Sequence, residues 1–405
     1  MPGRIVIVGG GEAAVSCIAT LRASDAAREI VLVGEEAYLP YRRPPLSKGC
    51  LIERLPPEKL ALRPLSWFDG IDLRLGCRAE AIERNDGRIV LGTGERLAYD
   101  HLVLCTGMSA RRLERAAGGA LAGVHTLRHL SDAVRLEADL VAGRRLLVVG
   151  GGYIGLEVAA AARARDMSVV LIEAGPRILG RVASASTADH MRALHAARGV
   201  EIREATGLAA LIGDGRVQRA ILSDGSEIAV DVVVVGIGAR PNDDLASSAG
   251  IATENGIAVD DLCRTSDPQV LAAGDCASFP LDGRRMRLES VQNASEQGEA
   301  VAATLLGAPK PYKPIPWFWS DQYDTKLQIV GLGEDHDEIV IRPGRRNNAK
   351  SFWYFKGERL LAVDAINDPA SYMAGRRLLA AGVNPDRRDI ADGSTALAGL
   401  LPAAA

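Results

Sequence analysis

The fold is decided by the stretch LLVVGGGYIGLE (residues 146–157), which runs through an alanine-rich segment into SVVLIE (168–173). A short apolar segment leads into glycines spaced G-x-G-x-x-G, and a helix-forming segment leads into a second apolar strand that ends in a carboxylate. This order is typical of a βαβ unit that binds a dinucleotide.

Each glycine of this motif has its own physical task. Gly150 allows the tight turn, Gly152 lets the backbone approach a pyrophosphate, and Gly155 lets the helix pack closely on the strand. The N-terminus of the helix offers N–H groups to the phosphates. Glu173 ends the second strand, where we expect it to accept hydrogen bonds from a ribose.

A second copy of the pattern lies at the N-terminus. Residues 4–8 read as a strand, Gly9-x-Gly11-x-x-Ala14 as the turn, Glu12–Ala23 as the helix, and Glu29–Val33 as the next strand before Glu35. Ala14 in the third position still allows close packing. Two fingerprints predict two dinucleotides bound at once; the alternative is a pair of glycine turns that bind nothing.

Composition limits the function classes. A length of 405 residues suggests two or three domains, and 47% hydrophobic residues is ordinary for a globular chain. The net charge of −3 gives no general attraction to nucleic acid or anionic lipid. No apolar run reaches the roughly 18 residues of a membrane span, and a strand that begins by Arg4 leaves no room for a signal peptide.

The six cysteines form no C-x-x-C pair. This spacing argues against zinc, an iron–sulfur cluster or a vicinal redox disulfide, so we expect no bound metal. A reducing, cytoplasmic location is the simplest interpretation.

Several further stretches contribute to the prediction. The loop LPYRRPPLSK (39–48) is stiffened by prolines and carries cations; alone it reads as a solvated surface loop. Residues 71–110 alternate like antiparallel strands, at 72–75, at 88–91 and from Leu97 onward, and end at Thr106-Gly107, a pattern that the centre repeats at Val232–Gly238. A strand ends at Gly274-Asp275, and a helix is expected from about Glu289 to Leu306.

The last part of the chain alternates again. It predicts strands at Leu327–Gly331, Glu338–Arg342, Ser351–Lys356 and Arg359–Val363, followed by a helix near Ser371–Ala381. We expect the alanine-rich end, 395–405, to be frayed.

This order of motifs resembles the glutathione-reductase-like flavoproteins, and among them the NADH-dependent ferredoxin reductases of the putidaredoxin-reductase type. The resemblance covers nearly the whole chain. Its specific pieces are LPYRRPPLSK (39–48), GGGYIGLE (150–157), TSDPQVLAAGDC (265–276), RLESVQNA (287–294) and PWFWSDQY (316–323).

The resemblance implies an α/β fold with two Rossmann-like domains, the FAD-binding one discontinuous, and a C-terminal α+β domain with an antiparallel sheet. The FAD-binding domain would comprise residues 1–110 and 246–319, the NAD-binding domain 111–245, and the C-terminal domain 320–405. The FAD would be bound without a covalent link, because no histidine or cysteine stands in a flavinylation-like context.

The resemblance also implies site residues. The FAD site would use Gly9, Gly11, Ala13, Ala14, Glu35, Arg43, Lys48, Ala79, Thr106, Gly107, Arg128, Asp275, Val291 and Trp319. The NADH site would use Gly150, Gly152, Ile154, Gly155, Glu157, Glu173 and Gly238. The carboxylate of Glu173 would repel a 2′-phosphate and so favour NADH over NADPH, although Arg177 and Arg181 are nearby cations.

The cysteines depart from the disulfide reductases of this superfamily. Those enzymes carry a C-x4-C pair near the first fingerprint, whereas Cys17 stands alone here. Single-cysteine relatives place their thiol about where Lys48 stands. Cys50 lies two positions later and is interpreted as packing, so no thiol chemistry is expected.

The resemblance implies an enzyme that takes hydride from NADH onto FAD and passes single electrons to an acidic [2Fe-2S] ferredoxin. That ferredoxin would supply a cytochrome P450 or a Rieske-type dioxygenase. Lys48 and Glu157 would flank the hydride-transfer region as catalytic residues; alternatively, Glu157 is an ordinary solvated helix residue. Two other functions stay open: reduction of monodehydroascorbate, oxygen or a quinone, and partner binding like that of apoptosis-inducing factor.

An acidic ferredoxin requires a basic docking face. The candidate clusters are Arg284-Arg285-Met286-Arg287, Lys310 with Lys313, and Arg342 with Arg345-Arg346, unless these are scattered solvated charges. Trp319 is expected between the flavin edge and the partner, with a core role as the alternative.

Overall fold

The computed structural model describes residues 3–25 and 27–401, which form two compact units. The first contains the described residues of Met1–Arg42, Pro57–Ser109 and Ala239–Pro314; the second contains those of Arg43–Pro56, Ala110–Gly238 and Ile315–Ala405. These two units are defined by the packing of the chain and not by the cofactors it binds. The predicted boundaries of the FAD-binding, NAD-binding and C-terminal domains therefore stay a prediction.

The first unit is built on a five-stranded parallel sheet in the order β19-β7-β1-β2-β3. Its strands are β1 (Ile5–Val8), β2 (Ile30–Gly34), β3 (Asp72–Leu75), β7 (His101–Leu104) and β19 (Val270–Ala272). All residues of β1, β2 and β19 are buried, as expected for strands covered on both faces. The prediction of an antiparallel strand at 72–75 is wrong, because β3 extends this parallel sheet.

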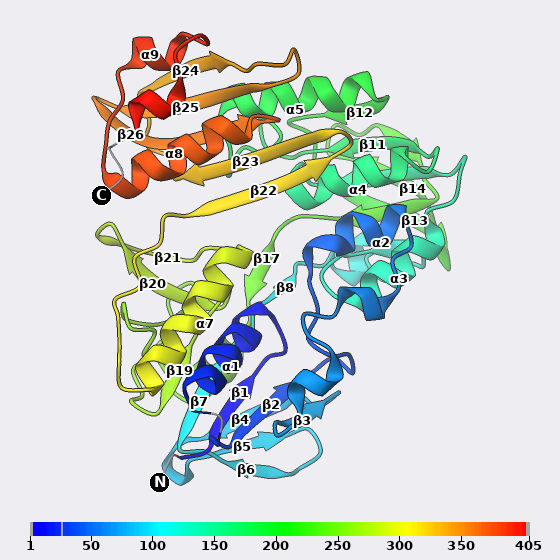
Figure 1. Cartoon of the computed structure of the whole chain (residues 1–405). Helices are drawn as coiled ribbons and strands as arrows, with labels where there is room; N and C mark the ends of the chain where they lie inside the picture. Colours follow the sequence, from blue (N-terminus) through cyan, green and yellow to red (C-terminus); the bar gives the residue numbers. More distant parts are fainter. Residues whose placement is uncertain (1–2, 26, 402–405) are drawn as a thin grey trace. The chain divides into compact units, whose positions relative to one another are not determined.

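Two helices far apart in the sequence pack against each other in this unit. Helix α1 (Glu12–Ser24) and helix α7 (Val291–Leu305) lie side by side in Figure 1. A Cβ on Gly298 would lie 2.3 Å from the carbonyl oxygen of Ala13, so only glycine permits this approach.

Smaller elements complete the first unit. The antiparallel strands expected at 88–91 and from Leu97 are present as β5 (Arg88–Leu91) and β6 (Arg96–Ala98), and they form a sheet with β4 (Ala79–Glu83), which was not predicted. Another small sheet contains β18 (Ile257–Ala258), β20 (Ala277–Leu281) and β21 (Arg284–Met286), and helix α6 spans Asp244–Ser248.

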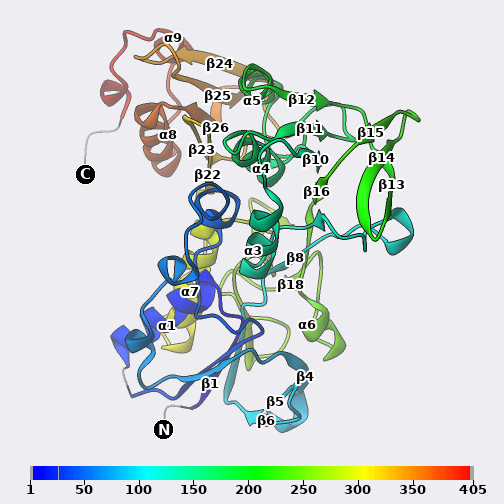
Figure 2. The same ribbon diagram turned by 90° about the vertical axis from the view of Figure 1, so that its right-hand side faces the viewer.

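The second unit contains another five-stranded parallel sheet, in the order β12-β11-β10-β16-β9. Its strands are β9 (Val124–His125), β10 (Arg145–Val149), β11 (Ser168–Ile172), β12 (Val200–Arg203) and β16 (Val232–Val235). The helices here are α2 (Gly49–Ile52), α3 (Leu130–Asp139), α4 (Tyr153–Arg163) and α5 (Ala185–Ala197). Figure 2 shows the ribbon of β13 (Leu208–Asp214), β14 (Arg216–Leu222) and β15 (Glu227–Ala229) beside this sheet.

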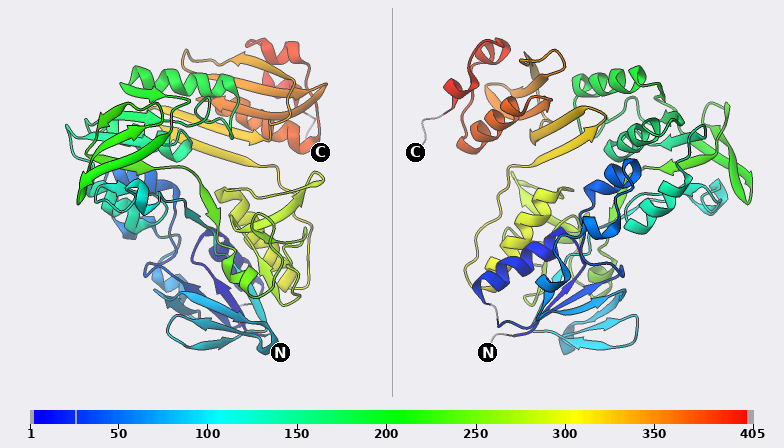
Figure 3. Two further views of the ribbon diagram at one scale, coloured as in Figure 1. Left: turned by 180° about the vertical axis from the view of Figure 1, so that it is seen from behind. Right: turned by 45° about the vertical axis from the view of Figure 1, so that its right-hand side comes forward.

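The second unit also contains an antiparallel sheet in the order β22-β23-β26-β25-β24. Its strands are β22 (Trp317–Gln322), β23 (Thr325–Gly331), β24 (Glu338–Pro343), β25 (Lys350–Lys356) and β26 (Arg359–Ile366). The four predicted strands are confirmed within two or three residues at each end, and β22 was not predicted as a strand. In Figure 3 (right), helix α8 (Pro369–Ala381, orange) lies on one side of the sheet and α5 (green) on the other.

The end of the chain is more ordered than expected. Helix α9 spans Arg387–Ala391, and a 3-10 turn spans Leu397–Leu400. Leu397, Leu400 and Leu401 pack against the core of the antiparallel sheet, so the prediction of fraying is wrong for this part. Residues 402–405 lie outside the described part. Among the described residues, no helix is both long and apolar enough to cross a membrane.

Candidate functional site

The first glycine turn joins β1 to α1. Gly9 has a φ of +115°, and a Cβ there would lie 2.1 Å from the carbonyl oxygen of Cys105, so only glycine fits. Gly11 caps the helix without a side-chain hydrogen bond, and a Cβ built on it meets no atom within 4 Å. Because Gly11 has no side chain that could bond the N–H groups of the first turn, which contains Ala13 and Ala14, these groups suit a pyrophosphate.

The returning strand β19 brings a second motif to the same helix end. Gly274 has a φ of +83°, and a Cβ on it would lie 3.2 Å from the Cβ of Ala13. The next residue, Asp275, accepts a hydrogen bond on its carbonyl oxygen from Nη1 of Arg287 at 2.9 Å. Val291 opens α7 directly after its capping residue Ser290.

Thr106 and Gly107 are held by a residue that the sequence did not single out. Thr106 Oγ1 donates to the carbonyl oxygen of Asn242 at 2.6 Å, and Asn242 Nδ2 donates to the carbonyl oxygen of Thr106 at 2.8 Å. The backbone N–H of Asn242 donates to the carbonyl oxygen of Gly107. The signal in the sequence that could have pointed to Asn242 is its position four residues after Gly238, a predicted site residue.

The candidate FAD residues fall into both units. The first unit contains Gly9, Gly11, Ala13, Ala14, Glu35, Ala79, Thr106, Gly107, Asp275 and Val291, and the second contains Arg43, Lys48, Arg128 and Trp319. Glu35 directly follows β2 with its side chain 65% exposed, and Ala79 is the first residue of β4.

The second glycine turn repeats the geometry of the first. Gly150 has a φ of +108°, and a Cβ there would lie 2.3 Å from the carbonyl oxygen of Gly236. Gly152 caps α4 without a side-chain hydrogen bond, and a Cβ built on it meets no atom within 4 Å. A Cβ on Gly155 would lie 2.2 Å from the carbonyl oxygen of Gly150. The residues present therefore fit a second dinucleotide.

Glu173 ties this turn to the loop that follows β11. Its Oε2 accepts from the N–H of Gly151 and its Oε1 from the N–H of Gly175, each at 2.7 Å. Gly238 has a φ of +95°, and Nη2 of Arg181 lies 3.5 Å from the position of a Cβ there. Ile154, in the first turn of α4, is 45% exposed.

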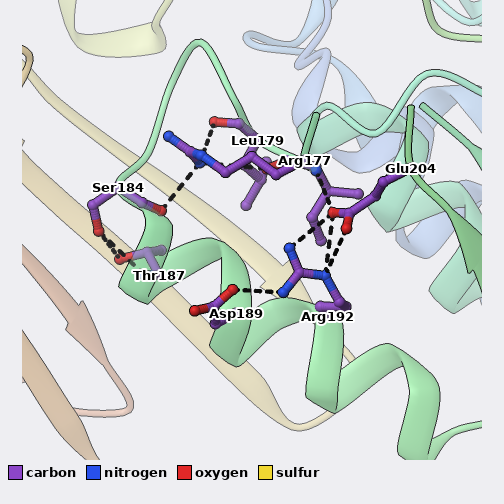
Figure 4. Close-up of polar contacts among 8 residues, drawn as sticks. Arg177, Leu179, Ser184, Thr187, Asp189, Arg192 and Glu204 are labelled. Atoms are coloured by element: carbon purple, nitrogen blue, oxygen red, sulfur yellow. Dashed lines mark hydrogen bonds and ion pairs between the residues drawn. The ribbon is translucent and has the colours of Figure 1, made fainter. Parts of the chain in front are cut away.

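Arginine–carbonyl contacts fix the loop after Glu173 (Figure 4). Arg177 donates to the carbonyl oxygens of Ala183 at 2.8 Å and Ser184 at 3.2 Å. Glu204 accepts from the N–H of Ile178 at 2.7 Å and from Arg192 (Figure 4). Because Arg177 is used inside the loop, Arg181, which is exposed, is the nearby guanidinium that can meet a phosphate.

Lys48 and Glu157 form an ion pair, with 2.8 Å between Nζ and Oε2. Ser47 Oγ donates to the same carboxylate oxygen, and Ser320 Oγ donates to Oε1 at 2.6 Å. Glu157 is only 5% exposed, so the alternative of a solvated helix residue is wrong. Sequence reasoning missed Ser47 and Ser320, although both lie inside recognisable motifs.

The other candidate FAD residues of the second unit lie near one another or on β22. Arg43 Nη1 donates to the carbonyl oxygen of Arg128 at 2.8 Å. Trp319 is half-buried on β22, with its ring centroid 5.6 Å from that of Trp317. The ring of Trp317 contacts Tyr372 of α8.

Comparison with known proteins agrees with this geometry. Residues 3–298 match the model of the pyridine nucleotide-disulphide oxidoreductase family, and residues 317–401 match a family described as reductase C-terminal. The chain belongs to the pyridine nucleotide-disulphide oxidoreductase family. Within it, the chain belongs with the ferredoxin reductases of the putidaredoxin-reductase type, and the predicted fold class is confirmed.

Relatives within the pyridine nucleotide-disulphide oxidoreductases match over nearly the full length. Rhodocoxin reductase of Rhodococcus erythropolis is 41% identical over 93% of this chain and 89% of its own. Putidaredoxin reductase of Pseudomonas putida is 38% identical over 99% of this chain and 97% of its own. The solved covalent complex of putidaredoxin reductase with putidaredoxin contains a chain with a TM-score of 0.94, 38% identity, and 98% coverage of both chains.

The thiols of this pyridine nucleotide-disulphide oxidoreductase are unpaired. All six cysteines are free. Burial raises the pKa of Cys17 to about 12 and that of Cys50 to about 11, so both are neutral thiols near pH 7. Within residues 3–25 and 27–401, no group of three or more His, Cys, Asp or Glu side chains could hold a metal ion.

The candidate basic clusters differ in exposure. Arg342 is 5% exposed and donates to backbone carbonyls, including that of Asp392 at 2.7 Å, so the prediction of Arg342 as a docking residue is wrong. The side chain of Arg287 is only 9% exposed and holds Asp275. Arg345 and Arg346 are exposed.

Proposed function

We propose that this chain is an FAD-dependent NADH:ferredoxin oxidoreductase that supplies a cytochrome P450 or a Rieske-type dioxygenase through a [2Fe-2S] ferredoxin. The observation that supports it most is the repeated glycine turn. Gly11 and Gly152 each cap a helix without a side chain, so each turn leaves backbone N–H groups for a pyrophosphate, as two separate dinucleotides require.

We assign the FAD-binding domain to residues 1–110 and 246–319, and the NAD-binding domain to residues 111–245. The FAD site uses the fourteen candidate residues named above, with Asp275 on the ribityl chain and Glu35 on the adenosine ribose. The NADH site uses Gly150, Gly152, Ile154, Gly155, Glu157, Glu173 and Gly238.

Bound FAD supplies the conversion between hydride and single electrons. The chain supplies placement: Glu173 presents a carboxylate beside the second glycine turn, where it suits a free ribose hydroxyl and disfavours a phosphate. The buried carboxylate of Glu157 and the partly exposed ammonium of Lys48 form a neutralised pair of charges for the reacting region. The buried thiols of Cys17 and Cys50, whose pKa values are raised to about 12 and about 11, are poor nucleophiles near pH 7.

The partner class is supported by the relatives. The anthranilate 1,2-dioxygenase system of Burkholderia cepacia contains a ferredoxin–NAD(+) reductase component that is 42% identical over 98% of this chain. Putidaredoxin reductase forms a complex with putidaredoxin. The exposed pair Arg345-Arg346 is the docking candidate for an acidic ferredoxin. A cytoplasmic location is part of this proposal, because six free thiols suit a reducing compartment.

Turnover measurements test this function. The FAD-loaded protein should reduce cytochrome c with NADH only when a [2Fe-2S] ferredoxin is added. Fast reduction of monodehydroascorbate, a quinone or oxygen without ferredoxin would favour the small-molecule reductase instead. A protein that binds both dinucleotides but reduces none of these acceptors would favour a partner-binding role.

A further inference from the structure

A chain of buried polar side chains continues from Glu157 into the antiparallel sheet of the same unit. Ser320 Oγ donates to Glu157 Oε1 at 2.6 Å, and Gln322 Nε2 donates to Ser320 Oγ at 3.0 Å. Gln322 Oε1 lies 2.7 Å from Nε2 of His195 on α5, and Tyr323 OH lies 3.2 Å from Nδ1 of His195. Ser320, Gln322 and His195 are each at most 1% exposed.

The hydrogen bonds in this chain point in one direction. The Gln322 amide gives an N–H to Ser320, so its oxygen must accept from Nε2–H of His195. Nδ1 of His195 is then an acceptor for the Tyr323 hydroxyl. With one lone pair used by Gln322, Ser320 directs its hydroxyl proton to Glu157. Every proton therefore points toward the carboxylate, and each bond polarises the next.

Burial keeps the side chains of this hydrogen-bonded series in the protonation states that this direction requires. It lowers the pKa of His195, so the ring is neutral near pH 7 and has one N–H. It raises the pKa of Tyr323 to about 12, so the phenol keeps its proton. In the part of the protein that the structure describes, Lys48 is the cation that pairs with Glu157, and the hydroxyls of Ser47 and Ser320 donate hydrogen bonds to its carboxylate.

We propose that Ser320, Gln322 and His195 are positioning residues: they fix the Glu157 carboxylate, and through it the Lys48 ammonium, for hydride transfer. This inference rests on the proposed function, since it assumes that Lys48 and Glu157 flank the reacting groups. A carboxylate held on Oε2 by Lys48 and Ser47 alone can rotate, and the bond to Oε1 from Ser320 removes that freedom.

The kinetic test compares Ser320→Ala with Ser320→Thr, which keeps the hydroxyl. In stopped-flow reduction of the FAD-loaded protein by NADH, Ser320→Ala should lower the limiting rate about 10-fold, as expected for one lost hydrogen bond to a charged group. The Kd for NADH should stay within about twofold, because the bond acts on placement and contributes little to binding. Ser320→Thr should restore most of the rate.

A double-mutant cycle separates positioning from a general structural effect. In a Glu157→Gln background, Ser320→Ala should change the limiting rate by less than about twofold, because the group it positions is already altered. Ser351, a buried serine of β25 that accepts from Trp353 Nε1 at 2.9 Å, provides the matched control, and Ser351→Ala should leave the rate unchanged. Equal losses in both backgrounds, or a wild-type rate for Ser320→Ala, would overturn the proposal.

A measurement that needs no turnover tests the direction of the hydrogen bonds between Tyr323 and Glu157. Selective ¹⁵N labelling of the six histidines, with His195→Gln to assign the signal, should show the Nε2–H tautomer at His195 in the holoenzyme. Gln322→Met should weaken that preference and lower the limiting rate. An Nδ1–H tautomer in the wild type would overturn the proposal even if the Ser320 variants fail to fold. Failure of the wild type to reduce ferredoxin would reject the proposed function, whereas these variant comparisons need only NADH and bound FAD.

Discussion

Lys48 Nζ lies 2.8 Å from Oε2 of Glu157, a carboxylate that is only 5% exposed. Lys48 ends the 3-10 turn Pro44–Ser47, whereas Glu157 lies on α4, so this contact fastens the proline-stiffened loop to the second dinucleotide fold. A buried carboxylate without its cation is costly, and the pair therefore has a measurable effect on stability.

Lys48→Met should lower the free energy of unfolding by about 2–4 kcal/mol, because Glu157 then stays buried with hydroxyl donors only. Chemical denaturation of the holoenzyme measures this. Lys59→Met, a change at an exposed lysine of the neighbouring segment, is the control and should stay within about 0.5 kcal/mol of wild type. Equal stability of the two variants would show that the ion pair contributes nothing.

Glu173→Ala should narrow the preference for NADH over NADPH by about 10- to 100-fold in kcat/KM, since one repulsive carboxylate is removed. The KM for NADH should also rise, because the hydrogen bonds to Gly151 and Gly175 are lost. Adding Arg181→Gln should reverse part of the NADPH gain, whereas Arg177 is committed to loop carbonyls. Equal kcat/KM for the two cofactors in the wild type would reject the role of Glu173.

Asp275→Ala should weaken FAD binding more than NADH binding, because Asp275 lies on the segment that meets the N-terminus of α1. Flavin content after gel filtration and NADH titration of the reloaded protein measure the two effects. Acid precipitation should release all flavin from the wild type, as expected for a non-covalent cofactor. A variant with full flavin and weaker NADH binding would contradict the FAD assignment.

Arg345→Glu/Arg346→Glu should raise the KM for ferredoxin and leave the KM for NADH unchanged. Ferredoxin-dependent turnover of the wild type should fall as NaCl rises from about 0.05 to 0.5 M, since the Debye length shrinks from roughly 14 to 4 Å. NADH-dependent reduction of ferricyanide is the control and should change little. Arg342→Ala should instead lower stability, because that side chain holds the carbonyls of residues 389–395. Equal effects of charge reversal on both assays would exclude this face from docking.

Asp364 should give the stability of the protein a distinctive pH dependence. Burial raises the pKa of Asp364 to about 6, while hydrogen bonds from Tyr354 and Thr187 partly offset this. The folded state therefore binds a proton more tightly than the unfolded state, so this group's contribution to stability is largest below about pH 4 and is lost as pH rises through about 6.

Asp364→Asn removes this titration and keeps a hydrogen-bonding side chain. The Tm of the variant relative to wild type should therefore be higher at about pH 7.5 than at about pH 4.5. A difference in Tm that is independent of pH would contradict the raised pKa. Glu358→Gln, at an exposed carboxylate of the turn between β25 and β26, is the control and should show no such trend.

The sequence by itself determined the local units and their order. Each glycine turn is a short motif whose residues are neighbours in the chain, so Gly9, Gly11, Gly150 and Gly152 could be assigned before any contact was known. The alternating strands between 327 and 363 followed from their period of two. The family resemblance rested on the same short motifs and is confirmed.

The tertiary structure alone decided the partners of side chains far apart in the chain. Ser320 meets Glu157 because β22 turns Phe318, Ser320 and Gln322 to one face and Trp317 and Trp319 to the other, and a register shift of one residue would exchange the two sets. Which face of β22 packs on α4 depends on the burial of the whole sheet. The six residues of β22 alone do not indicate it.

The same reason explains the basic residues. Arg342 and Arg345 carry the same charge. Arg342, however, is buried and donates to backbone carbonyls of residues 389–395, whereas Arg345 is exposed. Charge and local pattern are properties of the sequence. Burial and hydrogen-bond partners depend on which distant segments pack together, and only the folded chain specifies those.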